Sequence, residues 1–110
     1  LKNELPFFND SNLIPLSKPL FEKDALVFKN LRSNQIQIKS NKSRHGLQIE
    51  SHNFPYLGIW AAKNADFVCI EPWHGIADSV NTSGEILEKE GIICLEQNQD
   101  FSFTFLIKVF

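Results

Sequence analysis

The chain has 110 residues, of which 43% are hydrophobic and 22% charged, and its formal net charge at pH 7 is −2. This composition is ordinary for a globular domain or a part of one, which argues against wholesale disorder. The near-neutral charge argues against a non-specific nucleic-acid binder, and no apolar run approaches the ~20 residues that span a bilayer.

The first half of the chain predicts β-structure, because short runs rich in Phe, Ile and Val alternate with Pro, Asn, Ser and Gly. Residues 1–20 hold three of the five prolines, which remove backbone donors and favour extended neighbours, and they predict an irregular or edge segment. An apolar run at 25–28 follows. Strands are then expected at 34–40 and 46–50, joined by a hairpin connection at 41–46, and at 54–60.

The second half continues the same pattern. A strand is expected from residue 67 to 71, ending at Pro72, followed by a long loop at 74–84 and one helical turn within 84–91. Further strands are expected at 91–96 and at 101–110. The latter places Phe101, Phe103, Phe105, Ile107 and Val109 on one face and Ser102, Thr104 and Lys108 on the other. Six or seven short strands with turn signals every ~8–12 residues predict an all-β, mostly antiparallel sandwich or part of one.

The cysteines and histidines carry no metal or disulfide pattern. Cys69 and Cys94 each lie inside an apolar run and are expected to be buried free thiols, which makes a reducing, cytoplasmic location the expectation. His45, His52 and His74 lack the spacing of a metal site. We therefore expect no metal.

Glu71 is the strongest candidate for chemistry. In a strand it shares one face with Phe67, Cys69 and Trp73, so its carboxylate lies beside aromatic rings at the end of an apolar run. A carboxylate partly removed from water suits a general base, and aromatic faces stack on sugar rings. Spacing alone favours the plainer interpretation, in which Glu71 is a surface residue and Trp73 fills the core.

Asp24 is a second candidate carboxylate and lies directly before an apolar run. On sequence alone, the favoured interpretation is that it caps a turn or begins a strand.

Four segments carry a resemblance to a known family. The sequences FEKDALVF (21–28), FPYLGIW (54–60), ADFVCIEPWHGIADS (65–79) and KEGI (89–92) occur in that order. Together they resemble the C-terminal part of the aldose 1-epimerases, the galactose mutarotase-like proteins, in the bacterial branch with a CIEPW-type motif.

The resemblance implies that residues 1–110 are the C-terminal fragment of one large β-sandwich domain, called a supersandwich. It also implies an isomerase of carbohydrate metabolism that interconverts the α and β anomers of a free aldose without a cofactor. In that family a Glu takes the proton of the C1 hydroxyl and a His protonates the ring oxygen. By motif, Glu71 corresponds to the base and Asp24 to a residue that binds sugar hydroxyls. Trp60, Trp73 and His74 are expected to line the pocket through proximity.

One departure from the family is large. Its catalytic His and a substrate-binding Arg lie upstream of the segment matched by 21–28, and they have no counterpart in this chain. An epimerase would therefore be incomplete here and would need the upstream part of the same protein or a complementary chain. Such a fragment is expected to expose strand edges and an apolar sheet face. The alternative hypothesis is a non-catalytic carbohydrate-binding module on the same sandwich, because a fold does not determine a function.

Overall fold

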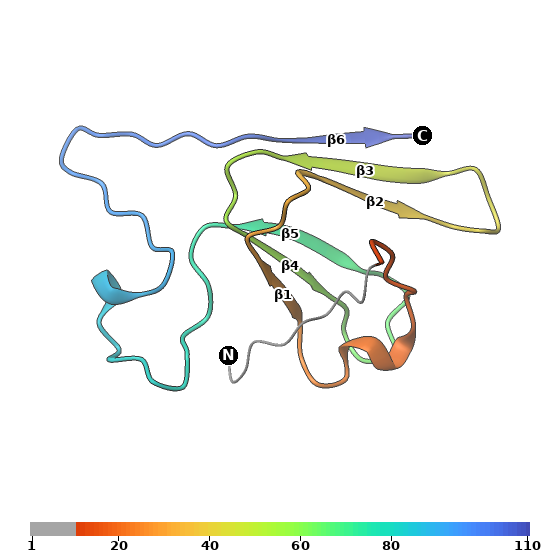
Figure 1. Ribbon diagram of the computed structural model, residues 1–110, viewed down its shortest axis with the longest axis horizontal. Helices are drawn as coiled ribbons and strands as arrows, with labels where there is room; N and C mark the ends of the chain where they lie inside the picture. The colour runs from red at the N-terminus through yellow and green to blue at the C-terminus, as the bar shows by residue number, and fades with distance from the viewer. Residues whose placement is uncertain (1–10) are drawn as a thin grey trace.

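The computed structural model describes residues 11–110, so the first half of the predicted irregular segment lies outside the described residues. The described part holds six strands and two 3-10 turns (Figure 1). They follow the order η1 (Lys18–Phe21), β1 (Leu26–Lys29), β2 (Gln35–Lys39), β3 (Gly46–Ser51), β4 (Tyr56–Trp60), β5 (Cys69–Trp73), η2 (Ile86–Glu88) and β6 (Phe105–Val109). Neither 3-10 turn is long or apolar enough to cross a membrane.

The strands form two antiparallel three-stranded sheets, which confirms the all-β prediction. One sheet has the order β1-β4-β5 and the other the order β2-β3-β6. In Figure 1 the chain passes from the first sheet to the second after β1 and returns after β3. The predicted hairpin is present as the β2–β3 pair, and the predicted helical turn within 84–91 is present as η2.

The core lies mainly on one face of the β1-β4-β5 sheet, and Ile49 of β3 and Ile76 are buried as well. Phe28, Leu57 and Ile59 form a buried cluster. Half-buried apolar side chains pack against it from the same sheet, from the η1 region and from β2, namely Ile14, Phe21, Leu26, Ile36, Val68 and Ile70. Because side chains alternate along a strand, the residues between these core positions point to the opposite face of the sheet.

The strand predicted to end at Pro72 continues through Pro72 to Trp73, which corrects that boundary. Pro72 is paired with Leu57 of β4. The reason is the position of β5 at the edge of its sheet, where β4 is its one neighbour among residues 11–110. Proline is tolerated on an edge strand because its missing N–H is not needed by a second neighbour. Trp73 is consequently part of the sheet and not of the following loop.

Two other predictions about the C-terminal half are wrong or too long. Residues 91–96 form no strand, and β6 begins at Phe105 instead of residue 101. A strand needs a hydrogen-bonding neighbour, and within the described residues 91–96 and 101–104 have none. Cys94 is for this reason exposed and not buried as expected, whereas Cys69 is half-buried in β5.

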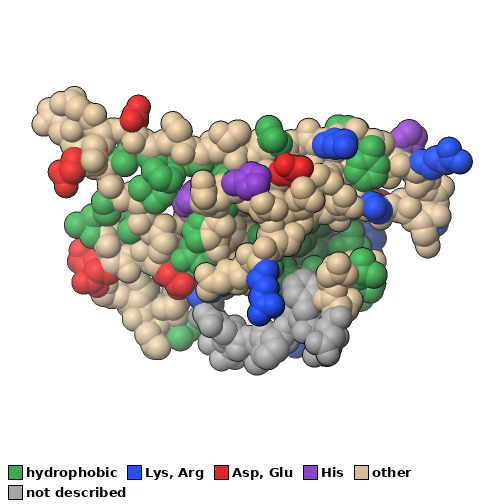
Figure 2. All heavy atoms as spheres, turned by 45° about the horizontal axis from the view of Figure 1, so that its top comes forward, with side chains coloured by type: hydrophobic (Ala, Val, Ile, Leu, Met, Phe, Trp, Pro, Cys, Tyr) green, Lys and Arg blue, Asp and Glu red, His purple; other side chains and the backbone are tan. Residues whose placement is uncertain are grey.

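The C-terminal third is unusually open, as a long coil in Figure 1 leads to β6 at the edge of its sheet. All five residues of β6 are exposed, among them Leu106 and Ile107 at 57% each. Figure 2 shows hydrophobic side chains reaching the surface among the polar ones. The accessible surface is 9192 Å², against about 6,000 Å² for a compact protein of this mass. The radius of gyration is 16.0 Å, against about 13 Å.

Candidate functional site

Glu71 lies in the middle of β5, directly opposite Gly58 of β4. Ile70 on the same strand packs against the core, so Glu71 projects from the other face of the sheet. Trp60 and Trp73 belong to that same face, because Trp60 is two residues from Gly58 and Trp73 is two residues from Glu71. The expectation that Glu71 shares a face with aromatic side chains agrees with this register.

Both indole nitrogens point at the Glu71 carboxylate. Trp60 Nε1 donates to Oε1 at 2.7 Å, and Trp73 Nε1 donates to Oε2 at 3.0 Å. An indole N–H is a donor only, so the carboxylate is the acceptor in both bonds. Each oxygen thus has its own partner, and the partners come from different strands. We call Trp60 and Trp73 together the indole pair.

Gly58 makes this arrangement sterically possible. A Cβ atom at position 58 would lie 2.6 Å from Cη2 of Trp73, closer than real Cβ contacts allow. The Trp73 ring therefore lies against the backbone of β4 at the position opposite Glu71. Phe67 extends the aromatic surface, since its ring meets that of Trp60 edge-on at 6.1 Å between centroids. Phe67 is 52% exposed, so the surface is open to solvent at this end.

Asp24 lies near the same end of the sheet as Trp60 but outside the strand. It precedes β1, and β1 pairs Leu26 with Ile59, the neighbour of Trp60. The Asp24 side chain is exposed, and its Oδ1 accepts the backbone N–H of Ala25 at 2.7 Å. Within residues 11–110 no hydrogen bond joins Asp24 to Glu71.

His74 is placed in an aromatic cluster instead of beside the carboxylate. Its ring lies 4.9 Å from the ring of Phe54, 5.4 Å from Phe101 and 5.3 Å from Phe103, measured between centroids. Its Nε2 is buried and has no hydrogen-bond partner among the described residues. This cluster connects the end of β5 to the segment that leads into β6.

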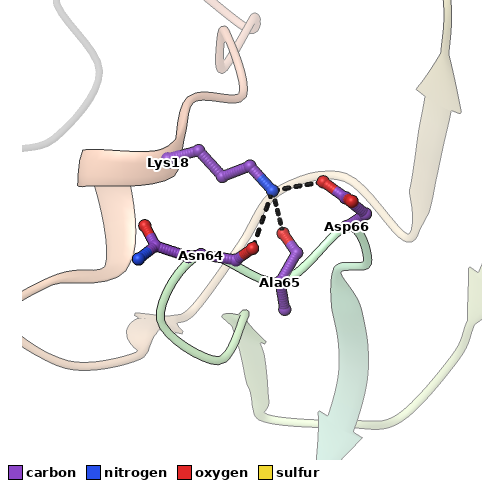
Figure 3. A network of polar contacts seen from close by, with 4 residues as sticks. All are labelled: Lys18, Asn64, Ala65 and Asp66. Atoms are coloured by element: carbon purple, nitrogen blue, oxygen red, sulfur yellow. Dashed lines mark hydrogen bonds and ion pairs between the residues drawn. The ribbon is translucent and has the colours of Figure 1, made fainter.

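A lysine holds the loop between β4 and β5, which precedes the Glu71 strand (Figure 3). Lys18 Nζ in η1 donates to the carbonyl oxygens of Asn64 at 3.0 Å and Ala65 at 2.6 Å. It also forms an ion pair with the Asp66 carboxylate. Through its hydrogen bond and its charge, Lys18 lowers the pKa of Asp66 below the ordinary value of 3.8.

The structure also has a cavity that the sequence did not indicate. It encloses about 260 Å³ where the β1–β2 and β3–β4 connections meet, and its polar lining includes Arg32, Asn34 and His52. His52 Nδ1 and Asn34 Nδ2 are 3.0 Å apart. These residues come from two loops with no shared motif, so only the fold reveals their proximity. Within residues 11–110, no three His, Cys, Asp or Glu side chains are grouped so that they could hold a metal ion.

Known proteins resemble this chain in sequence and in fold. The chain matches no protein-family model. It is 34% identical over 89 residues to the chromosomal and plasmid forms of Protein LacX from Lactococcus lactis subsp. lactis. The match covers 80% of this chain and 29% of each LacX protein.

The crystal structure of a galactose mutarotase related enzyme from Lactobacillus acidophilus superposes with a TM-score of 0.81 and 33% identity. The superposition covers 88% of this chain and 33% of that enzyme, so the chain spans about a third of the length of the relatives it matches. The sequence identity to LacX and the structural match to the galactose mutarotase related enzyme each cover at least 80% of this chain. The chain is therefore related to the galactose mutarotase-like proteins, with the β-sandwich architecture of a part of them.

Proposed function

We propose that this chain supplies the general base of an aldose 1-epimerase, with Glu71 in that role. The observation that carries the proposal is the Glu71 carboxylate, which two indole N–H groups hold on a half-exposed aromatic surface. Carboxylates accept sugar hydroxyls as hydrogen-bond donors, and aromatic rings pack on the C–H faces of sugars. The relationship to a galactose mutarotase related enzyme supports a sugar as the substrate.

The proposed reaction moves protons and breaks one bond. Glu71 takes the proton of the C1 hydroxyl as the bond between C1 and the ring oxygen breaks, and a general acid gives a proton to the ring oxygen. The product is the open-chain aldehyde. Rotation about the C1–C2 bond and the reverse steps close the ring with the opposite configuration at C1. Protons are returned to both groups, so no cofactor is consumed.

The general acid would come from outside this segment. Within residues 11–110 no histidine is hydrogen-bonded to Glu71, and the His74 ring packs against Phe54 instead. We infer that the acid is supplied by an upstream part of the same protein or by a complementary chain. The length of the relatives supports this, and so does the open surface around β6, which a further layer of sandwich would cover.

Asp24 is proposed to bind sugar hydroxyls, and Trp60 and Trp73 to form the wall of the pocket. Asp24 lies near the Trp60 end of the sheet with an exposed carboxylate, which suits that role. His74 is also predicted to line this pocket. In the structure its ring contacts Phe54, Phe101 and Phe103.

The test is anomer exchange on glucose and galactose, measured by NMR on the complete gene product that contains these residues. Glu71→Gln keeps the shape of the side chain and removes the base, so exchange is expected to fall ~10²–10⁴-fold while sugar binding persists. Glu85→Gln, an exposed carboxylate before η2, is the matched control and is expected to behave like the wild type. If the wild type leaves the spontaneous rate unchanged while sugar resonances still shift, the protein is a carbohydrate-binding module and the proposal is refuted for these sugars.

A further inference from the structure

We propose that the indole pair, Trp60 and Trp73, positions the Glu71 carboxylate for proton transfer. We also propose that the missing side chain of Gly58 leaves the space that the Trp73 ring needs. The inference rests on the proposed function, because it assigns a role relative to Glu71 as a base. It differs from a stacking role for the tryptophans. A stacking role depends on the ring faces, whereas positioning depends on the N–H groups.

Two bonds from two strands determine the orientation of the carboxylate. With one donor, the group would still turn about the remaining hydrogen bond. The second donor removes that freedom, because Trp60 is bonded to Oε1 and Trp73 to Oε2. The two strands are held in register by the β4–β5 ladder, in which Trp60 faces Cys69 and Gly58 faces Glu71. The direction of the carboxylate is thus tied to the sheet and not to a loop.

The indole pair leaves the carboxylate able to bind substrate. An ionised carboxylate has about four lone-pair sites, and the two indoles use one on each oxygen. Each oxygen keeps capacity for a sugar hydroxyl. Proton transfer requires a donor and an acceptor within hydrogen-bond reach, and a misplacement of about 1 Å can cost ~10²-fold in rate. A fixed carboxylate with free lone pairs is what this step needs.

Gly58 leaves room for the Trp73 ring against the backbone of β4. The atoms of Trp73 that a Cβ at position 58 would meet include Cη2 at 2.6 Å and Cε2 at 2.8 Å. These atoms belong to the six-membered ring of the indole, which is the part that a phenylalanine ring would not reproduce in the same place. Gly58→Ala should consequently displace Trp73 from Glu71 without removing any polar group.

The first experiment separates positioning from stacking with Trp60→Phe and Trp73→Phe in the complete gene product. Each variant keeps an aromatic ring and loses one N–H. We expect kcat for anomer exchange to fall about 10- to 100-fold in each while KM changes little, within the ~10²-fold range for a misplaced group. Gly58→Ala is expected to lower kcat as Trp73→Phe does, and to add little in the Trp73→Phe background.

The second experiment reads the hydrogen bonds without reference to catalysis. The indole N–H resonances of Trp60 and Trp73 are compared by NMR between the wild type and Glu71→Gln. At least one must move, because glutamine has one acceptor oxygen and its amide nitrogen only donates. Unchanged indole resonances would show that the bonds are absent and would overturn the positioning role.

The kinetic results distinguish the two proposals. A wild type that exchanges anomers, with Trp→Phe variants that keep kcat, overturns the positioning role and leaves Glu71 as the base. A rise in KM without a fall in kcat assigns the tryptophans to stacking on the sugar. That result likewise overturns the positioning role. A wild type without exchange activity refutes the epimerase for the sugars tested, whatever the indole resonances show.

Discussion

Replacing Ile107 by Ala tests whether a further layer of protein covers β6. Ile107 lies in the middle of β6, opposite the buried Ile49 of β3, and is 57% exposed in the described structure. Ile59 in β4 is the matched comparison, since it is the same residue type in a strand and is 6% exposed. If the chain is part of a larger sandwich, the two isoleucines should behave alike in the complete gene product.

The expected magnitudes differ enough to separate the two cases. Full burial of an isoleucine is worth about 1.5–3 kcal/mol, so an isoleucine with more than half its surface exposed loses about 1 kcal/mol or less on truncation to Ala. An isoleucine packed on all sides loses about 2–5 kcal/mol, because the cavity adds to the lost burial. We expect Ile59→Ala and Ile107→Ala both to lie in the higher range.

Urea unfolding of the complete gene product measures both free energies of unfolding, and equal m-values for wild type and variants show that the comparison is sound. A cost of about 1 kcal/mol or less for Ile107→Ala, beside about 2–5 kcal/mol for Ile59→Ala, would show that β6 stays exposed. That result would refute the argument that a further part of a sandwich packs here.

Two further predictions concern the loops around the site. Gly91 and Gly84 both have positive φ, at 75° and 82°, but a Cβ at Gly91 would lie 2.8 Å from the Tyr56 hydroxyl oxygen whereas Gly84 has open space. Gly91→Ala should therefore lower the free energy of unfolding by more than Gly84→Ala does. Gly84→Ala carries only the backbone cost, about 1 kcal/mol or more. Equal losses of the two variants in urea unfolding would contradict the Tyr56 contact. Asp66→Asn should destabilise at neutral pH. Because Lys18 lowers the folded-state pKa of Asp66 below 3.8, the stabilisation is present above pH 3.8 and is lost as pH falls through that lowered pKa. The difference between Asp66→Asn and wild type should accordingly vanish in strong acid, and a pH-independent difference would count against the ion pair.

Local pattern predicted the strands whose pairing partners are near in sequence. The alternation at 34–40 and 46–50 and the turn between them predicted the β2–β3 hairpin, because one hairpin satisfies its own ladder. The alternation at 101–110 was stronger, yet within the described residues its pairing with β3 begins only at Phe105. The apolar run at 91–96 has no neighbouring strand within the described residues. Side-chain pattern shows which residues favour a strand, but pairing depends on a partner that is brought in by the rest of the fold.

The sequence by itself determined that the chain is an antiparallel β-protein, and it placed Glu71 beside aromatic residues at the end of an apolar run. Both follow from alternation along the strand, which is a local property. Only the tertiary structure decided that Trp60, from another strand, donates to the same carboxylate as Trp73, and that His74 lies among Phe54 and the aromatic residues before β6. These contacts depend on the β4–β5 register and on the course of a long coil. Distances between residues far apart in sequence are set by such pairing, and a pattern within one strand carries no information about them.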